Sequence, residues 1–293
     1  MAGAVPAAVR AATAHDASAR VAFWIGGERV GSVAKAHLGA LAAFPESLRI
    51  DADGFWLTVP EAERDAALDR IARALHAAGL ILGWRDETYP VCTAPTQPPL
   101  ARIERAASRF WGTLTFGAHA NGYVTDDYDR PTHLWVAQRS LTKPTDPGMF
   151  DNLIGGGVPH GQTPLAALVR EGWEEAGLSP AQMADARPGS VIRLLRDIPE
   201  GLQHEWLYAY DLPLPPGLVP QNRDGEVANF RLLPVAEAIA LAEGETMTVD
   251  AALVTLDFAL RRRLLPAARQ AELAAAVAAM AAVASPAPAE PEG

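Results

Sequence analysis

The chain has 293 residues, an apolar fraction of 49% and a formal net charge of −10 at pH 7. This length suffices for two domains of the usual size, roughly 100–200 residues each. The acidic net charge and the lack of a dense Lys/Arg block before Arg261-Arg262-Arg263 argue against a binding surface for duplex nucleic acid. No stretch resembles a membrane span of about 20 apolar residues.

The single cysteine and the N-terminal residues bear on the cellular compartment in which the protein is expected. Cys92 has no second cysteine with which to form an internal disulfide, which fits a reducing compartment. The first 20 residues are Ala-rich and lack the charged and apolar regions of a signal peptide. We therefore expect a cytoplasmic protein that binds neither nucleic acid nor a membrane, and the sequence does not define its oligomeric state.

Residues 1–105 predict a small α+β domain. Short apolar runs bounded by glycine are typical of strands, and apolar residues three and four positions apart are typical of a helix. The expected elements are strands at Val21–Ile25, Arg29–Val33 and Phe55–Val59 and a helix from Pro60 to Gly79. A proline-rich connector, Pro90–Pro99, then ends this domain.

Residues 106–266 predict a second, larger domain. Its expected elements are strands at His133–Arg139, Ser190–Arg196, Glu205–Leu212 and Ala228–Leu233, a helix after Thr163 and a helix from Thr248 to Leu265. Residues 267–293 follow it, with an Ala-rich helix expected at Gln270–Val283 and a disordered tail at Ser285–Gly293.

A glycine loop followed by an acidic helix carries the chemistry of the second domain. Thr163-Pro164 predicts an N-cap and first helical residue, and Gly177 predicts the left-handed C-cap. Three glutamates, at 171, 174 and 175, share one helix face, where like charges repel by a few tenths of a kcal/mol per pair. A divalent cation offsets such repulsion, and Mg²⁺ is typically held by carboxylates together with substrate phosphates. The stretch therefore predicts a metal site for diphosphate chemistry.

This stretch resembles the Nudix box, whose pattern is G-x5-E-x7-R-E-U-x-E-E-x-G-U with U apolar. The residues at the required spacing are Gly156, Arg170, Glu171, Glu174, Glu175, Gly177 and Leu178. Gln162 replaces the first glutamate, and Gly172 occupies the apolar position, which suggests close backbone packing there. The resemblance implies the Nudix α/β/α sandwich with a mixed sheet, an α/β (α+β) fold, preceded by the smaller α+β domain.

Segments outside the box resemble one Nudix branch, the one associated with thiamin pyrophosphokinase. They include 134–140, Asn222–Val227, Gly83–Glu87 and His119–Tyr123. This branch implies hydrolysis of thiamin diphosphate, and of its oxidised oxo- and oxy- forms, to the monophosphate. The substrate assignment comes from the resemblance alone, since composition and spacing indicate only metal-dependent diphosphate chemistry.

The box assigns candidate roles to particular side chains. Glu171, Glu174 and Glu175 are the expected ligands of Mg²⁺, with Mn²⁺ as an alternative, and Glu174 and Glu175 are also expected to be catalytic. Arg170 is expected to orient a carboxylate, and Gly156 and Gly157 would let the backbone approach the metal. Gln162 keeps an oxygen acceptor but loses a charge.

Residues outside the box supply further candidates. Glu226, after Asp224-Gly225 at a strand entrance, is the expected catalytic carboxylate, with an exposed loop glutamate as the alternative and Glu205 as a weaker choice. Arg139, Lys143 and His160 are candidates for phosphate binding, against ordinary surface charges or a loop cap. The rings of Trp206, Tyr208 and Tyr210 could stack on a substrate but at this spacing fit the core better.

Three functional hypotheses follow from these features. The first is a thiamin-type diphosphatase, and the second is a Nudix hydrolase of another small-molecule diphosphate, such as a nucleotide sugar or a prenyl diphosphate. The third is a non-catalytic Nudix-fold binding module, which the replacements at Gln162 and Gly172 permit. The intact set of three glutamates favours an enzyme, since a binding module has no need for clustered carboxylates.

Overall fold

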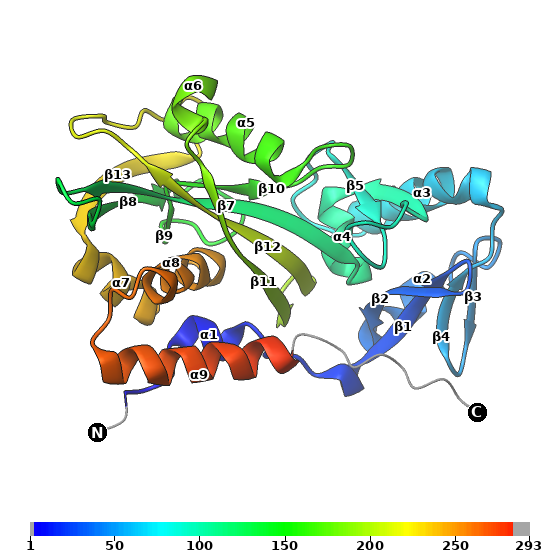
Figure 1. Cartoon of the computed structure of the whole chain (residues 1–293). Helices are drawn as coiled ribbons and strands as arrows, with labels where there is room; N and C mark the ends of the chain where they lie inside the picture. The colour runs from blue at the N-terminus through cyan, green and yellow to red at the C-terminus, as the bar shows by residue number, and fades with distance from the viewer. Residues whose placement is uncertain (1–2, 284–293) are drawn as a thin grey trace.

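A mixed sheet of seven strands forms the centre of the larger part of the molecule, as seen in residues 3–283, which the computed structural model describes (Figure 1). Its strands are β7 (Leu114–Thr125), β8 (Pro131–Arg139), β9 (Phe150–Asn152), β10 (Ile154–Gly157), β11 (Arg187–Ile198), β12 (Gly201–Pro213) and β13 (Val227–Pro234). Strand β7 pairs in parallel with β12 and antiparallel with β8 and β10. The mixed sheet predicted from the sequence is therefore present.

Helices cover both faces of this sheet (Figure 1). On one face, α5 (Pro164–Ala176) contacts β10 and β7, and the short α6 (Pro180–Met183) follows it. On the other face lie α7 (Val235–Glu243) and α8 (Val249–Arg261). The terminal helices α1 (Ala7–Ala11) and α9 (Ala267–Val283) pack on α8 and bury Val9, Leu273 and Met280 in the same core. This gives the predicted α/β/α layering.

The smaller part of the molecule has its own sheet and core. Within residues 3–283 the sheet order is β2-β1-β4-β3. Its strands and helices are β1 (Arg20–Ile25), β2 (Glu28–Ala34), α2 (Leu38–Leu41), β3 (Leu48–Asp51), β4 (Gly54–Leu57) and α3 (Arg64–Ala77). Single 3₁₀ turns occur at Ala17–Ala19, Lys35–His37 and Glu61–Glu63. Phe23, Phe55 and Leu68 are fully buried between the sheet and α3, as the predicted strand–turn–strand and helix require.

A ribbon of two strands and one helix joins the two parts. Strands β5 (Thr88–Val91) and β6 (Ala101–Glu104) pair antiparallel, and α4 (Arg105–Trp111) follows directly. We did not predict these elements, nor α7, because runs of four to nine residues offer little periodicity for detection. Phe110 and Trp111 of α4 lie in the core of the smaller part.

The remaining sequence predictions concern the chain ends and membrane spans. No helix within residues 3–283 combines the length and the apolar character needed to cross a membrane. The Ala-rich helix predicted at Gln270–Val283 is present as α9. The predicted disordered tail, Ser285–Gly293, lies outside the described residues.

Candidate active site

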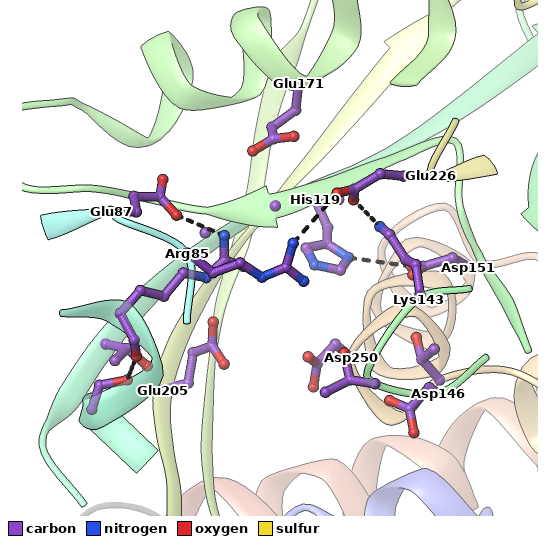
Figure 2. A pocket seen from close by; sticks show the side chains of 18 of the residues that line it. Arg85, Glu87, His119, Lys143, Asp146, Asp151, Glu171, Glu205, Glu226 and Asp250 are labelled. Atoms are coloured by element: carbon purple, nitrogen blue, oxygen red, sulfur yellow. Dashed lines mark hydrogen bonds and ion pairs between the residues drawn. The ribbon is translucent and has the colours of Figure 1, made fainter. Parts of the chain in front are cut away.

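A cavity of about 470 Å³ lies where the two parts of the molecule meet (Figure 2). We call it the charged cavity. Its α5 wall consists of α5, β10 and the loop Asp224–Glu226, and its α4 wall consists of Arg85–Tyr89 and α4. Ten Asp/Glu and six Lys/Arg of the described residues line it, so negative charge is in excess while the carboxyl groups are ionised.

The α5 wall depends on how α5 begins, ends and packs. Thr163 Oγ1 accepts a hydrogen bond from Ala166 N at 3.2 Å, and Gly177 ends the helix with a φ of 67°. A Cβ at Gly156 would overlap the Glu171 carboxyl group, so only glycine lets β10 pass so close to this side chain. The predicted caps are observed, and the backbone of β10 lies directly against the Glu171 side chain.

The buried face of α5 includes two of its three glutamates. Leu165 is 44% exposed, whereas Glu171 and Glu175 are buried beside Leu168, so two of the three glutamates face inward. A Cβ at Gly172 would lie 2.8 Å from Met183 Sδ, which accounts for glycine at a position where the Nudix pattern has an apolar side chain. The close packing suggested for Gly172 is therefore present.

Arg170 holds two carboxylates of the motif. Its Nη2 donates to Glu171 Oε1 and its Nη1 to Glu174 Oε2, both at 2.8 Å. Burial raises the pKa of Glu171 above its ordinary value, although the charge of Arg170 opposes this shift. Both glutamates line the charged cavity. This geometry supports an orienting role for Arg170.

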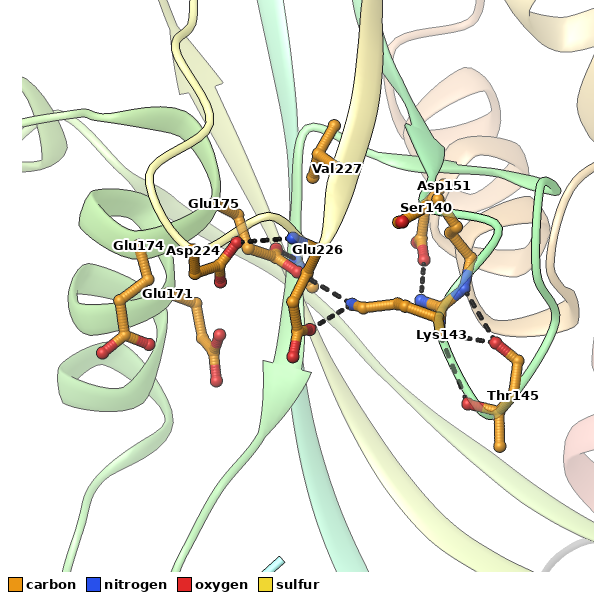
Figure 3. Close-up of polar contacts among 12 residues, drawn as sticks. Ser140, Lys143, Thr145, Asp151, Glu171, Glu174, Glu175, Asp224, Glu226 and Val227 are labelled. Atoms are coloured by element: carbon orange, nitrogen blue, oxygen red, sulfur yellow. Dashed lines mark hydrogen bonds and ion pairs between the residues drawn. The ribbon is translucent and has the colours of Figure 1, made fainter. Parts of the chain in front are cut away.

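Glu175 lies behind the wall and does not line the charged cavity. Its Oε2 accepts from Gly155 N at 2.9 Å, and Lys143 Nζ lies 3.4 Å from its Oε1 (Figure 3). Burial raises the pKa of Glu175 to about 8, which Lys143 offsets only in part. Glu175 thus fixes the glycine strand to the helix in this structure, in addition to its expected role as a ligand.

Glu226 enters the cavity from the loop before β13 (Figure 3). Its Oε2 lies 2.5 Å from Lys143 Nζ, and its Oε1 lies 3.6 Å from Arg85 Nη1. Burial alone would raise the pKa of Glu226, but the hydrogen bond and charge of Lys143, with Arg85, outweigh burial and lower it. The side chain is therefore held ionised toward the cavity, and it is not a loose surface glutamate.

The donor chemistry of the cavity fits a hard divalent cation. Glu171, Glu174 and Glu226 contribute carboxylate oxygens, the ligand type that Mg²⁺ and Mn²⁺ prefer. As they are placed, no three His, Cys, Asp or Glu side chains of the described residues are gathered tightly enough to hold a metal ion. Arg170 and Lys143 instead lie between the carboxylates and balance their charge.

The other predicted phosphate-binding residues fall in different places. Lys143 and Arg139 line the cavity, and Arg139 donates to Asp151 Oδ2 at 2.8 Å and to the Thr145 carbonyl, so it holds the 143–146 loop. His160 is exposed, accepts from Arg102 Nε at 3.1 Å and lies outside the cavity. Gln162 is also exposed and, with His160, lines a separate cavity of about 210 Å³ beside Cys92.

The far end of the charged cavity contains polar groups that the sequence did not reveal as a set. Glu205 and Asp250 lie at this end (Figure 2). Gln203 Nε2 donates to Glu205 Oε2 at 2.8 Å and to both Asp250 oxygens at 3.1 Å. Burial raises the pKa of Glu205, and the charge of Asp250 adds to the shift. Trp206, Tyr208 and Tyr210 do not line this cavity. Tyr210 is buried in the core, whereas Trp206 and Tyr208 are only partly buried against it, and Tyr208 lines the separate cavity beside Cys92.

Sequence reasoning missed further residues of the cavity, among them His119, Asp151, Arg105 and Arg109. His119 Nδ1 lies 3.0 Å from Asn152 Oδ1, so these residues from different strands meet in the fold. The segments 83–87 and 119–123 did stand out for their resemblance to one Nudix branch. That resemblance singled out these segments but did not indicate what their side chains do.

Two domain families match the chain. Residues 4–115 match a domain of unknown function, DUF4743, and residues 116–252 match the NUDIX domain. The chain therefore carries a Nudix domain preceded by a DUF4743 domain. The matched ranges meet ten residues beyond the boundary predicted at 105/106, so that α4 falls in the first of them.

Two relatives come from Arabidopsis thaliana. "Nudix hydrolase 20, chloroplastic" is 38% identical over 70% of this chain and 54% of its own length, and "Nudix hydrolase 24, chloroplastic" is 38% identical over 71% and 57%. The chain thus spans somewhat more than half of each relative. A solved structure, DR0079 from Deinococcus radiodurans, is 22% identical with a TM-score of 0.41, covering 60% of this chain and 94% of that one.

These matches confirm the predicted fold class and agree with the predicted enzyme class, a Nudix-type diphosphate hydrolase. They correct the predicted location. Both Arabidopsis relatives are named chloroplastic, which contradicts the cytoplasmic location predicted from the lone cysteine and the first residues. The presence of a single thiol does not discriminate among reducing compartments.

Proposed function

We propose that this protein is a Mg²⁺- or Mn²⁺-dependent hydrolase that cleaves a small-molecule diphosphate to a monophosphate and phosphate. The observation that carries the proposal is the meeting of the box carboxylates with Glu226 at one cavity. Glu171 and Glu174 reach it from α5, and Glu226 reaches it from a loop about fifty residues further along the chain. Surface glutamates without a shared task have no reason to converge in this way.

The residues divide the reaction between them. In the proposed reaction, water attacks one phosphorus of the diphosphate, the bond from that phosphorus to the bridging oxygen breaks, and the bridging oxygen leaves with the other phosphate. Glu226 is positioned to accept the proton from water, and Arg170 keeps the carboxylates of Glu171 and Glu174 oriented. The divalent ion, when bound, neutralises charge on the phosphoryl oxygens.

The lining of the cavity favours a polar substrate. Apart from Leu202 and Tyr89, its lining side chains are charged, hydroxyl, amide or imidazole groups, so an apolar prenyl chain would find few partners. At the far end, Glu205 and Asp250 converge on a single amide, that of Gln203, and this arrangement suits a head group that is cationic or rich in N–H donors.

Within this class we propose thiamin diphosphate and its oxo- and oxy- forms as substrates. The support is the resemblance of the segments around the box, together with the acidic far end, where the thiazolium charge or the aminopyrimidine N–H groups of thiamin diphosphate would be accommodated. Other polar diphosphates, including nucleoside diphosphate compounds, share the same requirement for the metal site. These substrates differ in the group attached to the diphosphate, so the fit of that group to the far end of the cavity distinguishes them.

A substrate panel tests the proposal. The purified protein is incubated with Mg²⁺ and with thiamin, oxothiamin, oxythiamin, nucleoside and prenyl diphosphates, and released phosphate is measured with Glu174→Gln as the inactive control. We expect turnover on polar diphosphates, and fastest turnover on the thiamin forms. Turnover on nucleoside diphosphates alone would reject the thiamin assignment. No turnover on any member would leave the non-catalytic binding module as the better hypothesis.

A further inference from the structure

Helix α4 is fixed in the DUF4743 domain and faces the Nudix site with its other side. Phe110 and Trp111 are buried in the core of the smaller part, next to Phe23. Arg105 and Arg109, one helical turn apart, line the charged cavity. The core of the first domain thus determines where two cations stand relative to the carboxylates of the second.

Arg109 differs from the other cations of the cavity. The remaining Lys/Arg residues that line it each have a carboxylate partner: Arg85 with Glu226, Arg105 with Glu87, Arg139 with Asp151, Lys143 with Glu226 and Arg170 with Glu174. Among residues 3–283, the Arg109 guanidinium has no carboxylate within 4.0 Å and makes no hydrogen bond.

The lack of a partner is informative because Arg109 is partly buried. Moving a cation away from water without a compensating interaction costs free energy, and an unpaired guanidinium keeps all of its planar N–H donors available. Burial raises the pKa of both Glu205 and Asp146 and the charge of Arg109 opposes this shift, yet neither carboxyl group makes an ion pair with Arg109. Its donors therefore remain available to an occupant of the cavity.

The α4 wall is also held in place by contacts to the α5 wall. Arg85 reaches Glu226 at 3.6 Å, and Glu87 lies 2.8 Å from Arg105 and 4.0 Å from Arg170. Tyr89 Oη occupies the space that a side chain at Gly157 would need. The Glu87–Arg105 pair lies within the first domain, and the other contacts cross between the domains at the site itself. They hold the α4 wall, with Arg109 on it, against the Nudix domain.

We infer that the DUF4743 domain forms a substrate-binding wall of the Nudix site and that Arg109 binds a phosphate group of the diphosphate. Guanidinium groups pair with phosphate oxygens in a bidentate fork, which adds orientation to attraction. The phosphate concerned is one that the α5 carboxylates do not hold through a metal. This inference rests on the proposed diphosphate chemistry and gives the domain of unknown function a task in it.

Binding of inorganic pyrophosphate tests the inference without relying on turnover. Its dissociation constant is measured calorimetrically on the full chain without added divalent cation, for the wild type, Arg109→Ala, Arg109→Lys and the control Arg29→Ala. Arg29 is an exposed residue of β2 in the same domain and lies outside the cavity. We expect Arg109→Ala to weaken binding by roughly 10- to 100-fold, Arg109→Lys to weaken it less, and Arg29→Ala to leave it unchanged.

Each outcome decides the inference. Equal affinity in the wild type and both Arg109 variants overturns it, as does an equal loss in Arg29→Ala, which would indicate an effect of net charge alone. Unfolding curves of the variants check that the fold is retained, and Arg109→Lys carries the test if Arg109→Ala does not fold. Arg109-dependent binding without hydrolysis in the substrate panel would sustain this inference while rejecting the proposed enzyme.

Discussion

The charged cavity has one wall on α5 and one on α4, and their charged groups are balanced differently. On the α5 wall, Arg170 lies between Glu171 and Glu174, and Lys143 reaches Glu226 from the 143–146 loop, so the charges of the groups proposed for chemistry are compensated. On the α4 wall, Arg109 lacks such a partner among the described residues. A wall that balances its own charges can stay in place without a ligand, whereas an unbalanced one gains most from a ligand of opposite charge.

The largest expected effect concerns the α5 wall. Glu174→Gln removes a carboxylate charge while keeping the side chain's size, and a lost metal ligand forfeits several kcal/mol of transition-state stabilisation, about a thousandfold or more in kcat. The rate of phosphate release measures it. The matched change Glu237→Gln, on the exposed side of α7, should leave kcat as in the wild type. Full activity in Glu174→Gln would show that Glu174 is not required as a metal ligand in the reaction.

The next effect tests whether the loop carboxylate belongs to the same chemistry. Glu226→Gln keeps a polar group near Lys143 and Arg85 but can no longer accept a proton. Loss of a general base typically lowers kcat by roughly 10²- to 10⁴-fold. A pure binding role would instead raise KM at constant kcat, and that pattern would contradict a role for Glu226 in proton transfer.

A third prediction concerns how α5 is set against β10. Gly172→Val places a branched side chain where even a Cβ lies 2.8 Å from Met183 Sδ and 3.2 Å from Ile154 Cδ1. Overpacking of this kind costs about 1–3 kcal/mol in the free energy of unfolding, measured by urea denaturation. Ala166→Val on the exposed side of α5 is the control and should cost less. Helix propensity alone would make Gly172→Val neutral or slightly stabilising, because valine is a better helix former than glycine. A loss in Gly172→Val no larger than that in Ala166→Val would therefore mean that packing does not explain Gly172.

The smallest effect is expected where the two parts of the molecule meet. Burial lowers the pKa of His204, on β12, from 6.5 to about 4. Strand β12 contacts both α4 and β2 at this place. Between these pH values the unfolded chain binds a proton that the folded chain does not, so this contribution to stability is present above pH 6.5 and is lost as the pH falls toward 4.

The variant His204→Gln checks this sign. Its free energy of unfolding should decline less steeply than that of the wild type between pH 7 and pH 5, as measured by urea denaturation. Parallel curves would mean that His204 does not titrate differently in the folded and unfolded chains. His204 would then make no contribution to the loss of folding stability at low pH.

The sequence by itself determined helix α5 and the spacing of its glutamates. Thr163, Gly177 and the three glutamates lie within one short segment, where helix period and capping fix relative positions to a single turn. The long strands β8 and β12 and the helices α3 and α8 were equally accessible, since apolar periodicity over many residues marks them. Local spacing was enough because all of these residues belong to single elements.

Only the tertiary structure decided the α4 wall and the state of the charges. Arg85 and Glu226 are far apart in sequence, and so are Gln203 and Asp250, and no local pattern predicts that they meet. The same holds for Lys143, which sequence reasoning offered as a phosphate ligand and which lies between Glu175 and Glu226. Periodicity fixes which face of an element a residue occupies, whereas its partner across a cavity depends on how separate elements pack together.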